Sequence, residues 1–319
     1  MTQEVATREA YGKKLAELGE KYPNIVVLDA DLSGSTKTEV FAKKFPNRFF
    51  NMGVAEQDLM GTAAGLAACG KIAFVSSFAM FAAGRAWEPL RQSIAYPHLN
   101  VKICASHAGL TVGEDGASHQ IIEDIALMRV IPGMHVFVPS DAIETEKVLE
   151  AAVEIQGACY IRLCRAKSPV LFDASYNFKP GKGNVIRTGK DGVPRAIGPR
   201  DICVFTNGFM TASVLEAAKK MEAGGVNCTV VNMASIKPID EELIVQMAKS
   251  HRILFSAEEH NVMGGFGSAI AEVLTTRYPQ RLIRLGVQDV FGQSGSYQAV
   301  LAHYKLDADG LVESIKKSL

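Results

Sequence analysis

The sequence lacks paired cysteines, long apolar runs and an apolar leader segment. Its six Cys in 319 residues are scattered, mostly within apolar runs, and no C-x-x-C pair occurs. We therefore expect buried free thiols in a reducing compartment, rather than disulfides or a zinc site. No run of about 18 apolar residues is present, so we expect no membrane span. The N-terminal residues contain no secretory h-region, and we expect a cytoplasmic protein.

An excess of charge of either sign is also lacking. Lys and Arg number 34, and Asp and Glu also number 34. This balance argues against nucleic acid or a membrane surface as a partner. A Walker A sequence and a G-x-S-x-G elbow are both absent, which argues against a P-loop nucleotide site and an α/β-hydrolase triad. His107 and His119 have no third ligand nearby in the sequence, so we expect no metal site built by this chain alone.

Apolar segments and amphipathic segments alternate along the chain, as in a parallel sheet covered by helices. We expect strands at 25–32, 49–54, 72–78, 101–106, 135–140 and 159–164. The stretch 173–200 is rich in Gly, Pro and basic residues and has no helical period. The predicted fold is α/β, with two open sheets that carry helices on both faces. The expected division is a first domain at 1–175, a linker at 176–198 and a smaller second domain at 199–319.

The strongest candidate for a site is the stretch 105–120, ASHAGLTVGEDGASHQ. It contains His107 and His119, the acidic pair Glu114 and Asp115, and three glycines at positions 109, 113 and 116. A predicted strand leads into it. In open α/β sheets, ligands bind where the carboxyl ends of strands deliver such polar loops. The alternative is a solvated loop whose histidines face water.

Three further groups follow predicted strands in the same way. They are the acidic and hydroxyl residues Asp29, Asp31, Ser33 and Ser35, the carboxylate Glu56, and the aromatic pair Phe78 and Phe81. Each has an ordinary explanation, since a carboxylate in a first helical turn favours the helix dipole and two Phe at a spacing of three often lie in a core. Their shared position at strand ends nevertheless predicts that they converge on one sheet edge.

Several runs in the chain resemble the transketolases. They are FFNMGVAEQDLMGTAAGLAACG, FVSSFAMFAAGRAWEPLRQSI and SHAGLTVGEDGASHQ in the first half, and SAEEHNVMGGFGSAIAEVL and VFGQSGS in the second. The resemblance covers nearly the whole chain and implies a thiamine-diphosphate-binding pyrimidine domain followed by a transketolase C-terminal-like domain. It implies transketolase activity (EC 2.2.1.1), in which a two-carbon ketol unit moves from a ketose phosphate to an aldose phosphate, as in the pentose phosphate pathway.

One departure from that family concerns the cofactor's diphosphate. Transketolases bind it through Mg²⁺ (or Ca²⁺) with a GDG motif in a preceding domain, and no GDG occurs here. The chain therefore resembles the C-terminal subunit of a split transketolase, active only with an N-terminal subunit that carries the GDG domain. We expect a heterotetramer in which the partner subunit supplies most of the metal site.

The resemblance also implies roles for the cofactor-binding residues. Glu56 matches the glutamate that hydrogen-bonds a ring nitrogen of the aminopyrimidine. Phe78 and Phe81 match the aromatic wall for that ring, and Asp31 matches an aspartate at the cofactor and subunit contact.

A second set of residues matches the substrate site of the family. His107, Asp115 and His119 match residues around the sugar hydroxyls, with the two imidazoles as proton carriers. Arg8, Ser35 and Arg165, with His107, match the grip on the sugar phosphate. Arg162 lies three residues before Arg165 and is the alternative to it.

Three other interpretations stay open. Deoxyxylulose-phosphate synthases share the glutamate and a similar His loop, although they are normally one long chain. The β subunits of pyruvate-type dehydrogenases share two such domains, although their His loop lacks GEDG. A non-catalytic regulatory module of the same fold is the remote alternative, and the presence of Glu56, His107, Asp115 and His119 argues against it.

Overall fold

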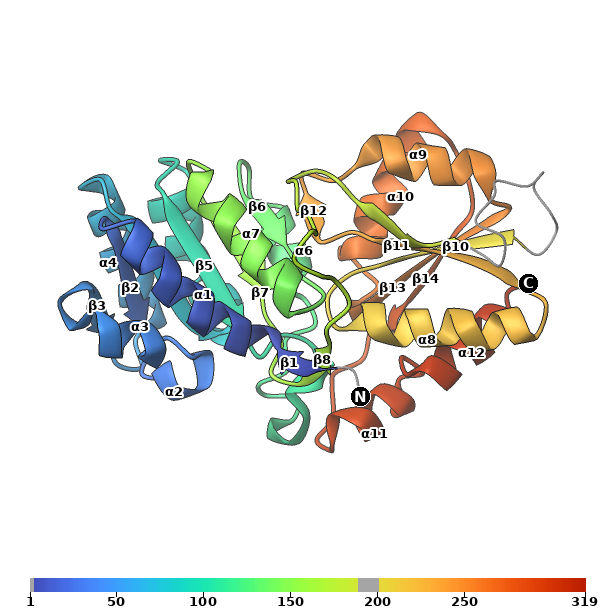
Figure 1. The fold of residues 1–319 in the computed structure, drawn as a ribbon, viewed down its shortest axis with the longest axis horizontal. Helices are drawn as coiled ribbons and strands as arrows, with labels where there is room; N and C mark the ends of the chain where they lie inside the picture. Colours follow the sequence, from blue (N-terminus) through green and yellow to red (C-terminus); the bar gives the residue numbers. More distant parts are fainter. Residues whose placement is uncertain (1–2, 189–200) are drawn as a thin grey trace.

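The computed structural model describes residues 3–188 and 201–319, which form two α/β lobes joined side by side (Figure 1). The first lobe contains a seven-stranded sheet in the order β12-β6-β7-β5-β4-β2-β3. Its strands are β2 (Ile25–Asp29), β3 (Phe49–Asn51), β4 (Ile72–Phe78), β5 (Val101–Ser106), β6 (His135–Phe137), β7 (Cys159–Arg162) and β12 (Ser235–Lys237). Neighbouring strands are parallel except β12, which is antiparallel to β6.

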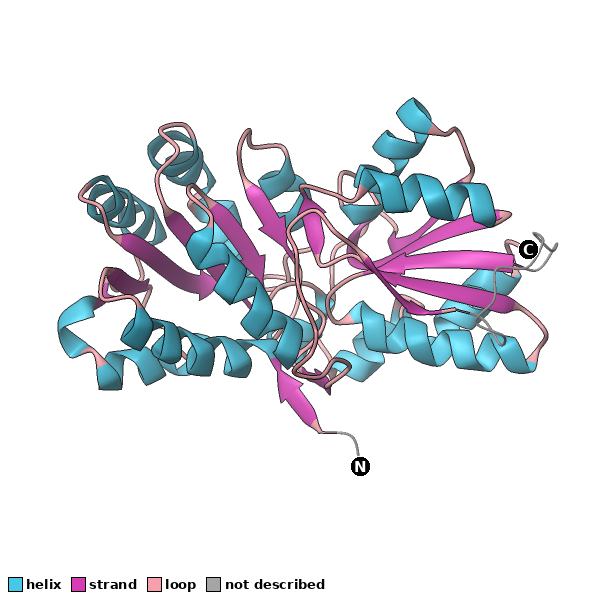
Figure 2. Ribbon diagram, turned by 45° about the horizontal axis from the view of Figure 1, so that its top comes forward, coloured by secondary structure: helices cyan, strands magenta, loops and turns pink. Residues whose placement is uncertain are grey.

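The strands of this sheet form where the sequence is continuously apolar. Every residue of β4 and of β5 is buried, as expected for parallel strands covered on both faces. The covering helices are α1 (Thr7–Lys21), α2 (Ser33–Thr36), α3 (Glu39–Lys44), α4 (Glu56–Ala68), α5 (Trp87–Pro89), α6 (Asp124–Arg129) and α7 (Ala142–Glu154). Figure 2 shows helices on both faces of each sheet, which confirms the predicted fold class.

Two segments of the first lobe are irregular. The stretch 79–96 contains two π-helical turns, η2 (Met80–Arg85) and η3 (Leu90–Ala95), on either side of α5. Pro89 has no N–H to donate, so a regular helix cannot continue through it. The polar stretch 33–38, SGSTKT, begins with the short helix α2.

The second lobe contains a five-stranded sheet in the order β14-β13-β10-β11-β9. Its strands are β9 (Asn184–Arg187), β10 (Asp201–Thr206), β11 (Asn227–Asn232), β13 (Ile253–Asn261) and β14 (Leu282–Val287). Its helices are α8 (Met210–Ala223), α9 (Glu241–Ser250), α10 (Phe266–Arg277), α11 (Tyr297–His303) and α12 (Ala308–Lys316). A separate ribbon pairs β1 (Glu4–Ala6) with β8 (Lys167–Pro169). The 3-10 helices η1 (Pro46–Arg48) and η4 (Leu110–Asp115) complete the chain.

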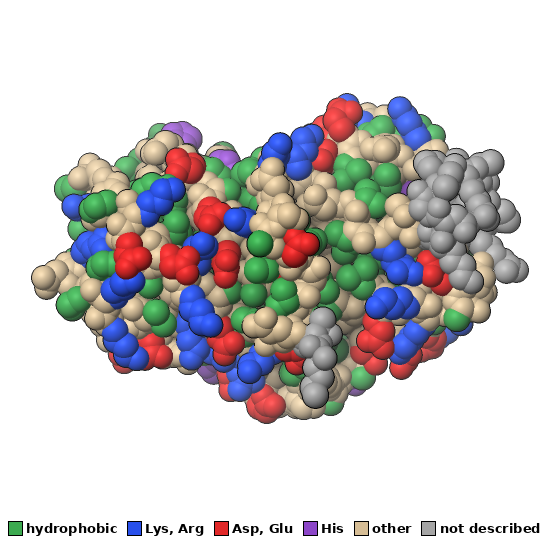
Figure 3. Space-filling model, viewed as in Figure 1, with side chains coloured by type: hydrophobic (Ala, Val, Ile, Leu, Met, Phe, Trp, Pro, Cys, Tyr) green, Lys and Arg blue, Asp and Glu red, His purple; other side chains and the backbone are tan. Residues whose placement is uncertain are grey.

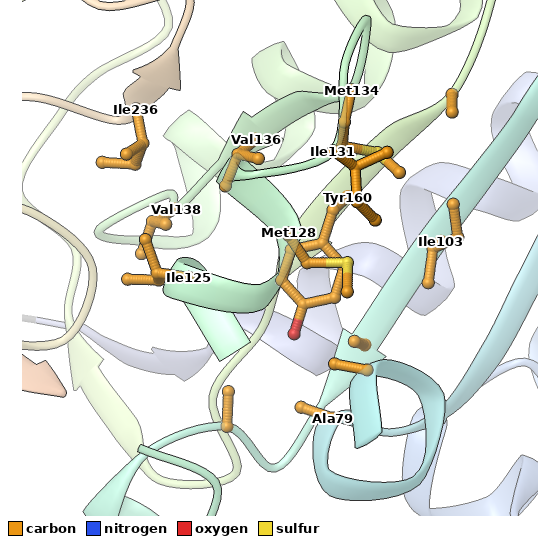
Figure 4. Packing of buried hydrophobic residues seen from close by; sticks show 14 of the residues in the cluster. Ala79, Ile103, Ile125, Met128, Ile131, Met134, Val136, Val138, Tyr160 and Ile236 are labelled. Atoms are coloured by element: carbon orange, nitrogen blue, oxygen red, sulfur yellow. The ribbon is translucent and has the colours of Figure 1, made fainter. Parts of the chain in front are cut away.

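The two lobes share structure at their junction. Strand β12 comes from the second half of the sequence and extends the first sheet. One apolar cluster continues from Met128, Ile131 and Val136 to Ile236 of that strand (Figure 4). The two lobes therefore share one hydrophobic core at their junction.

The segment expected to link the two domains, 176–198, contains β9, which pairs antiparallel with β11 of the second sheet. Positions 189–198 of that segment lie outside the described residues. The division at 175 and 199 remains our proposal for the domain boundaries.

Surface charge and cysteine placement complete the description. On the face drawn in Figure 3, acidic and basic side chains are interspersed.

Cys69 is exposed, the other five cysteines are buried, and all six are free. Within residues 3–188 and 201–319, no helix combines the length and the apolar character needed to cross a bilayer.

Candidate functional site

Four aromatic rings meet at the carboxyl ends of β4 and β5. The rings of Phe78 and Phe81 are stacked, with centroids 6.2 Å apart and an interplanar angle of 16°. The His107 imidazole stacks on Phe78 with centroids 3.8 Å apart, and the rings of His119 and Phe81 are T-shaped with centroids 5.5 Å apart. The structure therefore brings the predicted aromatic pair and both histidines of the loop into one cluster.

Glu56 lies beside this cluster as the first residue of α4. Its side chain is only 2% exposed, and its Oε2 accepts a hydrogen bond from Arg85 Nη1 at 3.1 Å. Among the described residues, no other side chain is hydrogen-bonded to this carboxylate. The structure thus presents a shielded carboxylate that Arg85 links to the stacked aromatic rings.

Arg85 belongs to this group, although the sequence analysis did not identify it. Its guanidinium lies 5.3 Å from the centroid of the Phe81 ring and pairs with Glu56. Arg85 follows Phe81 by four residues, a spacing that can place two side chains on the same side of a helical turn. That spacing is the signal that could have identified it.

His107 is held in a tightly defined position. Its backbone has φ 59°, and its Nδ1 lies 2.9 Å from Ser106 Oγ. Burial lowers the pKa of His107 to about 3, and the charges of Arg8, Arg165 and His119 act in the same direction. The imidazole is therefore neutral near pH 7, which is the form that accepts a proton, and its role as a proton carrier stays a prediction. Of the two histidines of the loop, His119 is the one that is partly exposed to solvent.

Two arginines face His107 from different elements. Arg8 donates through Nη1 to the Ser35 backbone oxygen at 2.8 Å, whereas its buried Nε has no partner among the described residues. Burial lowers the pKa of Arg8, Glu9 opposes this, and the nearby charge of Arg165 lowers it further. A half-buried cation with a free donor, close to a second cation, favours an anionic ligand.

Arg165 is the second cation, and its side chain is 37% exposed. It donates through Nη1 to the Val112 carbonyl oxygen at 2.8 Å and to Glu114 Oε2 at 2.7 Å. The arginine therefore reaches across the His loop from the end of β7 while it keeps access to solvent.

Arg162, the alternative to Arg165, is buried and paired with two carboxylates. The side chain is 1% exposed, and it bonds to Asp124 at 2.8 Å and to Glu259 at 3.3 Å. These two carboxylates satisfy its charge within the protein interior.

The two predicted aspartates lie on the exposed rim of the site. Asp31 has φ 62° and accepts a hydrogen bond from Asn51 Nδ2 at 2.8 Å. Asp115 is the last residue of η4 and is exposed. Asp29, by contrast, is buried and accepts bonds from Leu32 N, Thr36 Oγ1 and Thr38 Oγ1, so it organises the turn after β2.

The described part of the chain contains no group of three or more His, Cys, Asp or Glu side chains arranged to hold a metal ion.

Comparison with known proteins gives the same two-part organisation along the chain. Residues 3–170 match the family model of the transketolase pyrimidine binding domain, and residues 195–311 match that of the transketolase C-terminal domain. A protein of Methanocaldococcus jannaschii, whose name describes a transketolase C-terminal section, is 46% identical over 98% of this chain and 96% of its own length.

Two other relatives are similar over nearly the full chain. The 6-deoxy-6-sulfo-D-fructose transketolase subunit SqwH of a Clostridium species is 35% identical, covering 96% of this chain and 92% of its own. A solved structure described as a split gene transketolase in an inactive beta4 tetramer is 54% identical, with a TM-score of 0.88 over 98% of both chains.

Proposed function

Because this chain belongs to the transketolase family and corresponds to its C-terminal section, we propose that it is one subunit of a split, thiamine-diphosphate-dependent transketolase. The reaction would move a two-carbon ketol unit from a ketose phosphate to an aldose phosphate. The observation that carries this proposal is the shielded Glu56 carboxylate, which Arg85 links to the stacked rings of Phe78 and Phe81. We place the enzyme in the cytoplasm and in pentose phosphate metabolism.

The residues of the site fit the aminopyrimidine part of thiamine diphosphate. An aromatic wall suits a flat heterocycle, and a shielded carboxylate suits a ring nitrogen that must share a proton. Phe78 and Phe81 would stack on the ring, and Glu56 would hold the proton at its carboxylate. When bound, thiamine diphosphate supplies the electron sink for cleaving and forming the carbon–carbon bond.

The residues of the His loop would orient the sugar and move its protons. His119 is partly exposed and lies at the edge of Phe81, so we assign it the proton transfers at the sugar hydroxyls. Without a bound phosphate His107 is neutral near pH 7, and it would act as a hydrogen-bonding group. Asp115 and Asp31, on the rim, would contact the sugar and the cofactor or subunit boundary respectively.

Arg8 and Arg165 would bind the sugar phosphate, with Ser35 and His107 beside them. The buried Nε of Arg8 has no partner among the described residues and is an available donor. A dianionic phosphate would also favour a charged His107, because it would offset the two guanidinium charges that disfavour the imidazolium.

The partner we propose is an N-terminal transketolase subunit that carries the GDG diphosphate-binding domain. It would provide most ligands of Mg²⁺ or Ca²⁺, since the described residues contain no metal-binding cluster. A heterotetramer is the assembly we expect. The related beta4 tetramer is described as inactive, which is consistent with a site that needs a second kind of chain.

Ketol transfer from xylulose 5-phosphate to ribose 5-phosphate tests this function. The chain is assayed alone and with a GDG-domain subunit from the same cell, with thiamine diphosphate and Mg²⁺. Activity only in the mixture supports the proposal. Turnover of pyruvate instead would favour the deoxyxylulose-phosphate synthase or pyruvate dehydrogenase alternatives, and the absence of both activities would favour the regulatory module.

The anion on the donor sugar is a second question that the same assay answers. The Clostridium relative is named for a sulfonated fructose, and paired guanidinium groups can bind a sulfonate as well as a phosphate. The proposal of a phosphorylated donor predicts a higher kcat/KM for fructose 6-phosphate than for 6-deoxy-6-sulfofructose, and the reverse order would transfer the assignment to the sulfonated sugar.

A further inference from the structure

The three glycines of the His loop lie against the second lobe. A Cβ atom on Gly109 would lie 2.5 Å from Glu259 Cδ, and one on Gly116 would lie 2.1 Å from Ser294 Oγ. A Cβ on Gly113 would lie 3.3 Å from the Gly295 carbonyl oxygen. All three residues also have positive φ, between 74° and 79°. The loop is glycine-rich because the C-terminal half of the chain approaches it so closely.

Glu259 makes the most deeply buried of these approaches. This residue of β13 is 2% exposed, and its Oε2 accepts a hydrogen bond from the backbone N–H of Thr111, at 3.1 Å. Its Oε1 accepts from Arg162 Nη1 at 3.3 Å and from Cys164 Sγ at 3.6 Å. A single carboxylate of the second lobe therefore joins the His loop to the buried arginine of β7.

The Arg162 guanidinium is paired with two carboxylates, those of Glu259 and Asp124. Arg162 Nε donates to Asp124 Oδ2 at 2.8 Å, and the Tyr160 hydroxyl donates to the same oxygen. The backbone oxygen of Glu259 accepts a further bond from Arg162 Nη2 at 3.2 Å. Removing one charge from such a buried pair leaves the other uncompensated, so the carboxylate is held firmly in place.

A second contact holds the other end of the loop. The buried Gln120 amide donates to the Leu110 carbonyl oxygen at 3.2 Å and to the Gln293 carbonyl oxygen at 3.0 Å. A Cβ on Gly292 would lie 1.8 Å from Gln120 Oε1. The segment 292–297 therefore closes over the loop where η4 returns towards His119.

We propose that the second lobe is a positioning element of the active site, acting through Glu259 at Thr111 and through the segment 292–297 at Gln120. It sets the separation and orientation of His107 and His119 without contributing a side chain to the aromatic cluster. Its consequence for turnover rests on the proposed function, whereas its effect on the loop does not. A misplacement of about 1 Å in a catalytic group can cost roughly a hundredfold in rate.

Amide hydrogen exchange on the chain alone tests the effect on the loop without any turnover. In Glu259→Gln, exchange in the peptide 107–120 should accelerate at least tenfold, while β2 and β4 keep their protection. Gly292→Ala should accelerate exchange in the same peptide while leaving the Arg162 network intact. Glu272→Gln is the matched control, because Glu272 pairs with Arg129 across the same junction but is 64% exposed.

Kinetics in the reconstituted enzyme give the second readout. Glu259→Gln and Gly292→Ala should each lower kcat/KM for the donor at least tenfold, and Glu272→Gln should not. Unchanged loop exchange in both test variants would overturn the proposal, even if activity falls. If Glu259→Gln unfolds the chain, Gly292→Ala alone decides the matter by the same criterion. If the reconstituted wild-type enzyme has no transketolase activity but loop exchange is faster in the two variants, the proposed function is refuted. The positioning role of the second lobe is then still supported.

Discussion

The guanidinium of Arg165 donates to the carboxylate of Glu114 at 2.7 Å, so an acidic residue of the His loop occupies one of the two cations assigned to the sugar phosphate. The pair is exposed, with 37% and 62% of the two side chains accessible. Exposed pairs of this kind contribute little free energy, and a phosphate can displace the carboxylate.

The first prediction concerns this competition. Glu114→Gln should lower the KM for a phosphorylated ketose by up to about fivefold, because the phosphate would no longer have to displace the carboxylate from Arg165. The KM for an unphosphorylated ketose should stay unchanged. Steady-state kinetics with both donors measures the difference, and a higher KM for the phosphorylated donor would mean that Glu114 helps binding instead.

The second prediction concerns Arg165 itself. Arg165→Ala should raise the KM for phosphorylated sugars about tenfold or more, since hydrogen bonds to charged groups contribute roughly 1.5–3 kcal/mol. An unphosphorylated donor serves as the internal control. An equal loss with both donors would show that Arg165 shapes the loop through the Val112 carbonyl and does not bind phosphate.

Removal of the Glu56 carboxylate is the third test. Glu56→Ala should abolish thiamine-dependent turnover while leaving the folded structure intact, because the side chain would no longer hold a proton at the pyrimidine ring. Asp58→Ala is the matched control, since Asp58 carries the same charge in the same helical turn but is exposed. Turnover near the wild-type rate in Glu56→Ala would refute the assigned role.

The fourth prediction follows from the neutral state of His107. Its folded pKa is lowered to about 3, whereas an unfolded histidine titrates near 6.5, so the unfolded chain binds a proton that the folded chain does not. Stability should therefore fall as pH drops from 6.5 towards 3. At pH 5 this one group should cost roughly 2 kcal/mol.

Urea unfolding at fixed protein concentration measures this dependence. His107→Asn should become more stable relative to the wild type as pH falls from 7 to 5. A constant difference between the two proteins over that range would mean that the imidazole titrates normally in the folded chain.

The fifth prediction separates the two neighbouring arginines by stability. Arg162→Ala should lower the free energy of unfolding by about 3–5 kcal/mol, because Asp124 and Glu259 would be left as unpaired buried charges. Arg165→Ala, at a partly exposed position, should change it by less than about 1 kcal/mol. Equal losses in the two variants, compared in the same urea titration, would contradict the structural distinction.

The sequence by itself determined the architecture and the identity of most candidate residues. Strands β4 and β5 lie at the predicted residues, because continuous apolar runs between polar loops have few other stable arrangements than buried parallel strands. Glu56 begins a helix as predicted, and the motifs around it were specific enough to indicate the family that the comparisons establish.

Only the tertiary structure decided the surroundings of each candidate side chain. Arg162 and Arg165 are three residues apart and chemically identical, and their difference is set by Asp124 and Glu259, which come from distant parts of the chain. The neutral His107 likewise depends on burial and on cations from α1 and the end of β7. The loop glycines could be found by inspection, but the reason for them is the close approach of residues 259 and 292–297. Contacts of such long sequence separation are fixed by packing, which no local pattern records.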